Sequence, residues 1–293
     1  MGSLIARRVA GRRFDSNLDT DIVSETRNAE LVLKVRTRVQ PCPLLPGNIA
    51  HDYDHVPHRA VPLSESDVAR RWDLIKEKTE STWNDKLWLI PDPPLEFHHV
   101  FRADRTRAIC PFIRCVLLIV PCPEGATPHL TINVVQRVNT SVGFRSSAGN
   151  GSMTLDDEEF LSSSHTIAHE MGHHIGLAHV HRFTEACLTH PDRYGRVGGD
   201  NSCYGIGEPW TPDNVMGAGL RVEAWNSWPW RSRMNQHWDI GHDWRRDPPP
   251  AHTRDLYHEP RGRPRPRVIQ FHPVERGDAD PVAGVRDLPD GGV

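Results

Sequence analysis

Three histidines and one glutamate stand at spacings that could hold and use a metal ion. His169 and His173 are four residues apart, so on a helix their side chains project from the same face. At that spacing both imidazoles can reach one ion at about 2.0–2.1 Å. Glu170 follows His169 and would be rotated by about 100° from it around the helix. We therefore expect Glu170 to be the catalytic base acting on a metal-bound water, and not a ligand.

His179 is expected to be the third ligand, although it lies ten residues beyond His169. A continuous helix would carry it about 15 Å along the axis, too far for an imidazole to reach back. Gly176 lies between the second and third histidines, and glycine adopts the left-handed conformation that ends helices. The sequence thus predicts a turn at Gly176 that returns His179 to the ion. Three neutral imidazoles leave a position for water, as in catalytic zinc sites, so Zn²⁺ is the predicted cofactor.

The stretch His169–His179 reads H-E-M-G-H-H-I-G-L-A-H, and Met216 lies within D-N-V-M-G further along the chain. Together these two motifs resemble the extended zinc motif and the Met-turn of metzincin zinc endopeptidases. The resemblance implies an α+β fold with a mixed twisted sheet and two helices in an upper subdomain. An active-site cleft would separate it from a small irregular lower subdomain with a C-terminal helix. Met216 would lie beneath the ligand histidines as a packing residue.

The residues around the two motifs do not specify a metzincin branch. Val180 follows the third histidine, where several branches have a polar residue or proline. Ala218 stands two residues after the turn methionine, where one branch has a tyrosine that can reach the zinc. Tyr194 and Tyr204 are alternative candidates for a residue that donates a hydrogen bond to the transition state. No branch's substrate preference therefore carries over to this chain.

The chain of 293 residues is expected to contain one large domain between two polar ends. Residues 1–30 are interpreted as a solvated arm. The metzincin-like catalytic domain is placed at 31–244, with an upper subdomain at about 31–179 and a lower one at about 180–244. Residues 245–293 are rich in proline and arginine, which predicts an extended tail that wraps the domain or is disordered.

Hydrophobic periodicity predicts the elements that must position these residues. Ser64 and Asp67 form a capping pattern for a helix at 64–83. The active-site helix is expected to begin between Asp156 and Ser164, and Pro229 to open a closing helix that carries Trp230, Met234 and Trp238. By the family resemblance, an edge strand within 141–155 would pair with an extended substrate. Strands are predicted at 31–39, 86–90, 97–102, 115–120 and 129–138, with 115–120 central and 129–138 as its neighbour.

Several other side chains are weaker candidates for a role. His165 lies one turn before the ligands and is expected to support them from behind, to line the cleft or to face solvent. His174 is expected to be on the surface or satisfied in the core. Cys42 is a candidate for a latch that blocks the zinc, although the surrounding latch motif is absent. The six cysteines contain no C-x-x-C motif, and Cys187 with Cys203 is the pair most worth testing as a disulfide.

Composition limits the classes of partner. A formal net charge of −3 argues against nucleic acid, whose binders usually carry a basic excess. No apolar run approaches the 18 or more residues of a membrane span, and the arginine-rich start lacks the apolar core of a classical signal peptide. We expect a monomer acting on a protein or peptide substrate. The localisation stays open, and export by a specialised system, for instance as an effector or toxin, fits the start of the chain.

Three alternatives to a zinc endopeptidase remain at this stage. The first is a zinc-stabilised binding protein without turnover, against which the presence of Glu170 argues. The second is a zinc amidohydrolase that acts on a non-peptide amide. The third is a gluzincin-type site, in which a later carboxylate such as Glu185 replaces His179 as the third ligand.

Overall fold

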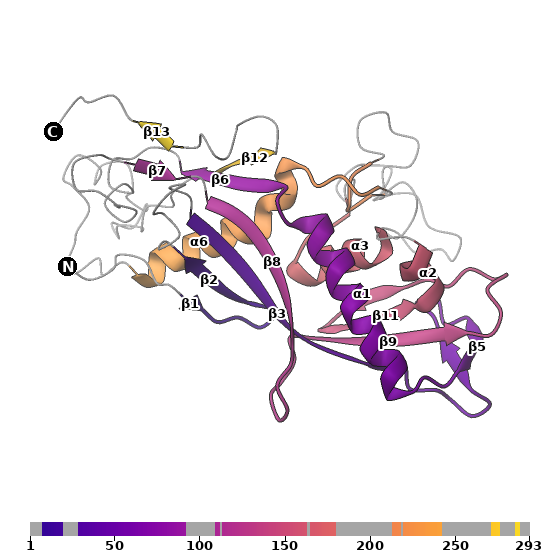
Figure 1. Cartoon of the computed structure of the whole chain (residues 1–293). Helices are drawn as coiled ribbons and strands as arrows, with labels where there is room; N and C mark the ends of the chain where they lie inside the picture. The colour runs from indigo at the N-terminus through magenta and orange to yellow at the C-terminus, as the bar shows by residue number, and fades with distance from the viewer. Residues whose placement is uncertain are drawn as a thin grey trace, which may run out of the picture.

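The computed structural model describes residues 8–19, 29–91, 109–111, 113–162, 165–179, 213–217, 219–241, 271–275 and 285–287. Within them the chain is an α+β protein, in which helices pack against a mixed 11-stranded sheet (Figure 1). The helices are α1 (Glu65–Trp83), α2 (Asp157–Ser162), α3 (His165–Ile175), the 3₁₀-helix η2 (Ala224–Ser227) and α6 (Trp228–Gly241). The strands are β1 (Arg8–Val9), β2 (Asp15–Asp19), β3 (Ala29–Pro41), β4 (Ile49–His51), β5 (Pro57–Val61), β6 (Leu87–Pro91), β7 (Ile109–Pro111), β8 (Ile113–Pro121), β9 (Leu130–Arg137), β10 (Ser147–Gly149), β11 (Ser152–Asp156), β12 (Phe271–Glu275) and β13 (Val285–Asp287).

Strand β3 is the centre of the sheet, and the sheet order is β10-β11-β9-β3-β8-β6-β12. The alternation that predicted a strand at 31–39 is confirmed, because Leu31, Leu33 and Val35 are fully buried. Strands β8, β9 and β11 run parallel to β3 or to one another, whereas β6 and β10 are antiparallel to their neighbours. β10 ends the sheet on the side that contacts α3.

The predicted pairing of 115–120 with 129–138 is wrong, because β3 lies between β8 and β9. β8 pairs with β3 up to Thr37, and β9 begins to pair with β3 at that same residue. The two strands are therefore staggered along β3, on opposite edges of it. A short connection normally cannot join parallel strands. The stagger permits one here, since the chain crosses β3 without having to run back along the sheet (Figure 1).

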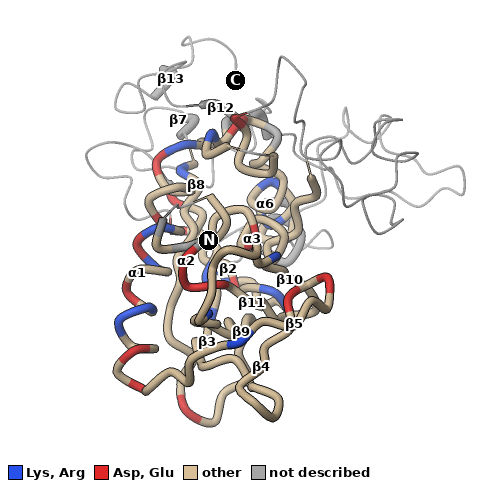
Figure 2. The backbone as a smooth tube through the Cα atoms, turned by 90° about the vertical axis from the view of Figure 1, so that its right-hand side faces the viewer, with Lys and Arg blue, Asp and Glu red and all other residues tan. Residues whose placement is uncertain are grey.

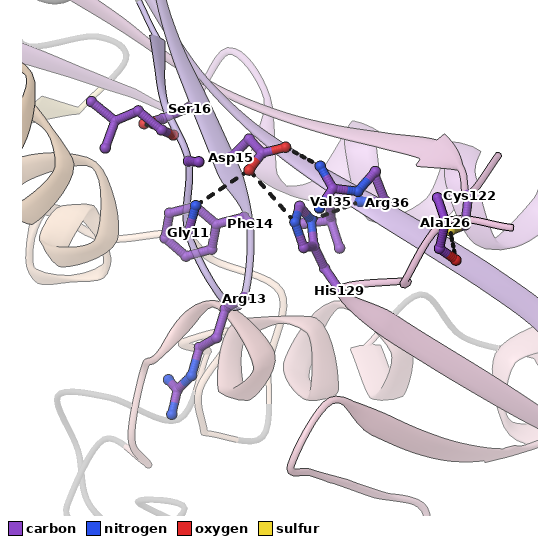
Figure 3. A network of polar contacts seen from close by, with 12 residues as sticks. Gly11, Arg13, Phe14, Asp15, Ser16, Val35, Arg36, Cys122, Ala126 and His129 are labelled. Atoms are coloured by element: carbon purple, nitrogen blue, oxygen red, sulfur yellow. Dashed lines mark hydrogen bonds and ion pairs between the residues drawn. The ribbon is translucent and has the colours of Figure 1, made fainter.

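The interpretation of residues 1–30 as a solvated arm is wrong for Arg8–Asp19. Strands β1 and β2 form an antiparallel ribbon, and β2 pairs with β3. Phe14, Ser16 and Leu18 are buried, an alternation with period two that is characteristic of a half-buried strand. Asp15 points toward Arg36 of β3 and His129, as Figure 3 shows. The ribbon is therefore part of the domain.

Helix α1 covers one face of the sheet and agrees with its prediction. Ser64 is its N-cap, and Ser64 and Asp67 form a complete capping box. Trp83, in the last turn, is fully buried and donates from Nε1 to the carbonyl of Ala168 at 3.2 Å. Its ring also lies 6.1 Å from that of Trp230 on α6. Acidic and basic residues are interspersed along α1 (Figure 2), as expected of a helix with a solvated outer face.

The active-site helix starts later than predicted. Asp157 opens the short helix α2, and α3 begins only at His165. The acidic residues at this point form buried ion pairs. Asp157 pairs with Arg71 of α1, and Asp156 pairs with Arg137 of β9. These pairs fix the end of β11 to α1 and β9 just before the chain enters α2.

The C-terminal part of the chain contributes two strands that the sequence did not predict. β12 pairs with β6 at one end of the large sheet, and β13 pairs with β7. The closing helix α6 begins at Trp228, one residue before Pro229, and its Trp230 and Met234 are fully buried. The predicted strand 97–102 lies outside the described residues. No helix in the described parts of the chain has the length and apolar character that a membrane span needs.

Candidate metal centre

Helix α3 presents two of the three predicted ligands on one side, and another side of the helix packs into the hydrophobic core. Ile167, Ala168 and Met171 are fully buried, so this side of the helix packs against the sheet and α1. His169 and His173 follow the predicted spacing of one turn. The amphipathic pattern thereby fixes the rotation of α3, and this rotation sets where the two imidazoles lie.

The helix ends where the sequence predicted, in a Schellman motif at Gly176. Gly176 has a φ of 110°, in the region that favours glycine. Its amide donates to the carbonyl of His173 at 3.1 Å, and the amide of Leu177 donates to that of Gly172 at 2.9 Å. The chain therefore leaves the helix axis at this point, and His179 returns toward the first two histidines.

The three imidazoles converge through their Nε2 atoms. The Nε2 of His173 lies 3.1 Å from that of His169 and 2.9 Å from that of His179. The ligand atoms of these three residues all lie within 4.8 Å of one another. Two nitrogens that bind one ion tetrahedrally at about 2.0–2.1 Å would lie about 3.3–3.4 Å apart. The spacing is thus close to what a shared ion requires, and this trio can hold a metal.

The other ring nitrogens of two ligands face backbone carbonyls. His169 Nδ1 lies 2.9 Å from the carbonyl oxygen of Val215, and His173 Nδ1 lies 3.0 Å from that of Leu177. Since a carbonyl only accepts, each Nδ1 must carry the proton and donate it. Each Nε2 then presents a lone pair to the common point. A hydrogen bond from the second ring nitrogen to a backbone carbonyl is typical of metal-binding histidines.

Burial favours the uncharged form of the first ligand. His169 is 3% exposed, and its pKa lies well below the usual value of 6.5, first because of burial and then because of the neighbouring His173 and His179. A neutral imidazole is the form that binds a metal. The electrostatic environment therefore agrees with the tautomers that the carbonyls impose.

The turn that contains Met216 packs directly on α3. Met216 is fully buried, and a Cβ at Gly172 would lie 2.2 Å from its Sδ atom and 3.2 Å from Trp83 Cζ2. Only glycine at 172 permits this approach. The sequence motifs do not predict this role of Gly172, although glycine inside a helix is a known sign of close packing.

The remaining predicted residues of α3 take different positions. Glu170 is 9% exposed and is not among the three grouped ligands. His165 is bonded through Nε2 to the carbonyl of Gly217 at 3.0 Å, so it braces the turn from one helical turn before the ligands. His174 is satisfied in the core, where its Nε2 lies 2.8 Å from the carbonyl of Arg13.

Cys42 is not part of the group of histidines. It follows β3, its amide donates to the carbonyl of Val134 at 2.9 Å, and its thiol is free. It lines a pocket beside Ala60 and Leu44. The other candidates lie outside the described residues: Val180, Glu185, Cys187, Tyr194, Cys203, Tyr204 and Ala218.

Comparisons of the chain with protein-family models, with curated proteins and with solved structures found no match. The assignment of a function to this centre therefore depends on its residues and their geometry.

Proposed function

We propose that this chain is a zinc-dependent endopeptidase of the metzincin type. The observation that carries the proposal is the convergence of three imidazole Nε2 atoms, two from α3 and one returned by the bend at Gly176. Three histidine ligands with one position left open are the donor set of catalytic zinc. His169, His173 and His179 would hold the ion.

Zinc in such a site would polarise a peptide carbonyl and make water a stronger nucleophile at neutral pH. The protein would supply the rest. The carboxylate of Glu170 would take a proton from the attacking water as its oxygen bonds to the carbonyl carbon. It would then deliver that proton to the amide nitrogen as the C–N bond breaks. Val215 and Leu177 would keep the ligand rings oriented throughout.

The arrangement of elements is consistent with a peptide substrate. The order of strand, helix, strands and metal-bearing helix is the one expected of the upper subdomain in the resembled family. β10 ends the sheet next to α3, and among the described residues it pairs with β11 alone. An extended peptide could add to this edge as a further strand, with its carbonyls near the histidines.

Substitution of Glu170 tests the proposal. Glu170→Gln and Glu170→Ala should retain the metal and lose about 10²–10⁴-fold in peptide cleavage, because the ligands stay while the base is removed. A proteome-derived peptide mixture should be incubated with each protein, and the cut sites identified by mass spectrometry. Glu77→Gln, at an exposed position of α1, is the matched control and should cleave as wild type does.

Two results would contradict the proposal. Normal cleavage by Glu170→Ala would exclude Glu170 as the base. Bound zinc with no cleavage of any peptide by wild type would instead favour a zinc-stabilised binding protein or an enzyme acting on a non-peptide amide.

A further inference from the structure

Asn214, two residues before the turn methionine, is fully buried and has its polar atoms committed to hydrogen bonds. Its Nδ2 donates to Glu223 Oε2 at 2.8 Å and to Asn226 Oδ1 at 3.2 Å. Its Oδ1 accepts from the amide of Met216 at 2.8 Å. Its own carbonyl accepts from the amides of Gly217 at 2.8 Å and Gly219 at 3.1 Å. One side chain and its carbonyl thus organise the whole turn.

The turn fixed in this way supplies the carbonyls that face α3. Val215 O accepts from His169 Nδ1 at 2.9 Å, and Gly217 O lies 3.0 Å from His165 Nε2. These two acceptors come from the residues immediately after Asn214 and Met216. A rotation of the peptide planes in the turn would move the Val215 carbonyl and release the ring of His169.

We propose that Asn214 is a positioning residue for the metal centre, which acts through the Val215 carbonyl on the orientation and tautomer of His169. The inference rests on the proposed function in one respect, that the three histidines bind a metal. Asn214 itself would touch neither metal nor substrate. Its amide, held by Glu223 and Asn226, would keep the first ligand preorganised.

The test depends on the fact that the amide of Asn214 donates a hydrogen bond to the carboxylate of Glu223. Asn214→Asp keeps an oxygen for the Met216 amide but places a carboxylate against that of Glu223. We expect it to weaken Zn²⁺ binding about 10–100-fold, the usual effect of removing support behind a ligand. The double variant Asn214→Asp with Glu223→Gln restores a donor between the two positions and should recover part of the affinity. Affinity is measured by competition with a chromophoric chelator, and ligand geometry by the visible absorption of the Co²⁺-loaded protein.

Asn84→Ala is the matched control for a purely structural effect. Asn84 also bridges backbone groups, bonding both the amide and the carbonyl of Leu117, at 2.7 Å and 3.1 Å. Its loss should lower stability without changing Zn²⁺ affinity or the Co²⁺ spectrum. Where Asn214→Asp does not fold, Asn214→Ser keeps an oxygen that can accept from the Met216 amide, and it replaces the two N–H donors of Nδ2 by one hydroxyl on a shorter side chain.

The proposal is overturned if a folded Asn214 variant binds Zn²⁺ within twofold of wild type with an unchanged Co²⁺ spectrum. It is equally overturned if Asn84→Ala weakens binding as much. Because the experiment measures metal affinity, it tests the positioning role of Asn214 even when the wild type cleaves no peptide. That last result would contradict the proposed protease function alone. A wild type that binds neither ion would overturn both.

Discussion

Gly176 acts twice on the candidate metal centre through a single backbone conformation. Its positive φ ends α3, so that His179 can return to the other ligands. The same bend places the carbonyl of Leu177 3.0 Å from His173 Nδ1. The second ligand is therefore oriented by the segment that delivers the third. A change at this residue should affect both imidazoles together.

Gly176→Ala should destabilise the protein by about 1–2 kcal/mol, because an L-residue is strained in the left-handed region. It should also weaken zinc binding, because the strain is relieved by moving Leu177 and His179. Urea unfolding and chelator competition would measure the two effects. Gly143→Ala is the control, since a Cβ there meets no atom within 4 Å, and it should change stability by less than about 0.5 kcal/mol. Unchanged metal affinity in Gly176→Ala would contradict the role of the bend.

At the residue scale, the sequence predicted the group of three histidines but not its supports. The ligands follow from local spacing along one helix and one turn. Gly172 acts through contacts with Met216 and Trp83, which are distant from it in sequence. Asn214 acts through Glu223 and Asn226, which lie 9 and 12 residues further along the chain. No local period encodes such contacts. The contact of His169 with Val215 could not be predicted either, because a backbone carbonyl is present in every residue and the type of side chain does not reveal its role.

Among the elements, the N-terminal ribbon is held to the sheet by a cluster of charged groups. Asp15 of β2 pairs with Arg36 of β3 and lies 3.6 Å from His129 Nε2 (Figure 3). His129 Nδ1 accepts from the amide of Arg36 at 3.1 Å. From the other side, Arg233 of α6 donates to the carbonyl of Phe14 at 2.9 Å. The ribbon thus joins β3, the start of β9 and α6.

His129 should make the stability of the domain depend on pH. Its pKa is lowered in the folded state, first by burial and then by the charge of Arg36, while Asp15 opposes the shift. The unfolded chain therefore takes up a proton near pH 6.5 that the folded chain does not. The contribution of His129 to the free energy of unfolding is fully present above about pH 6.5. It falls as the pH drops toward the pKa of the folded state, by at most about 1.4 kcal/mol per pH unit.

His129→Asn should flatten the pH dependence of the unfolding free energy below about pH 6.5. The asparagine oxygen can still accept from the Arg36 amide, so the strand connection is preserved. Denaturant titrations at several pH values would measure the slope. His51→Asn, at an exposed position, is the control. An equal slope in wild type and His129→Asn would show that His129 does not contribute.

Strand and helix identities were predictable where the sequence alternates or caps clearly, as at Leu31–Val35 and Ser64. Sheet order was not, because closeness along the chain predicts β8 and β9 as neighbours, whereas β3 lies between them. Their stagger about Thr37 depends on the length of β3, which pairs with three strands. The ribbon at Phe14–Leu18 was missed since its buried positions include the polar Ser16, whose hydroxyl meets His237 at 2.8 Å.

In the whole molecule, the candidate metal centre joins segments that are distant in sequence. The ligands lie at 169–179, whereas the turn behind them lies at 213–217 and leads through η2 into α6 (Figure 1). Trp230 of α6 then donates to the carbonyl of Val116 on β8 at 3.1 Å. A bound ion would therefore stabilise the contact between α3, the turn and the closing helix.

Removing the metal should lower the unfolding temperature of the whole domain. An ion that binds only the folded chain stabilises it by about 2.7 kcal/mol when its free concentration is 100 times the dissociation constant. A thermal scan with and without a chelator would measure the loss, and added Zn²⁺ should reverse it. His179→Ala should respond less to either treatment. An unfolding temperature that is the same with zinc and with chelator would contradict a folded-state metal site.

The most direct measurement is the zinc X-ray absorption spectrum of the purified wild-type protein, together with its metal content. We expect one zinc per chain, bound by three imidazole nitrogens and one further light atom at about 2.0–2.1 Å, and by two imidazoles in His179→Ala. Sulfur ligands, two imidazoles in the wild type, or no change on removal of His179 would contradict the three-histidine centre on which the proposed peptidase depends.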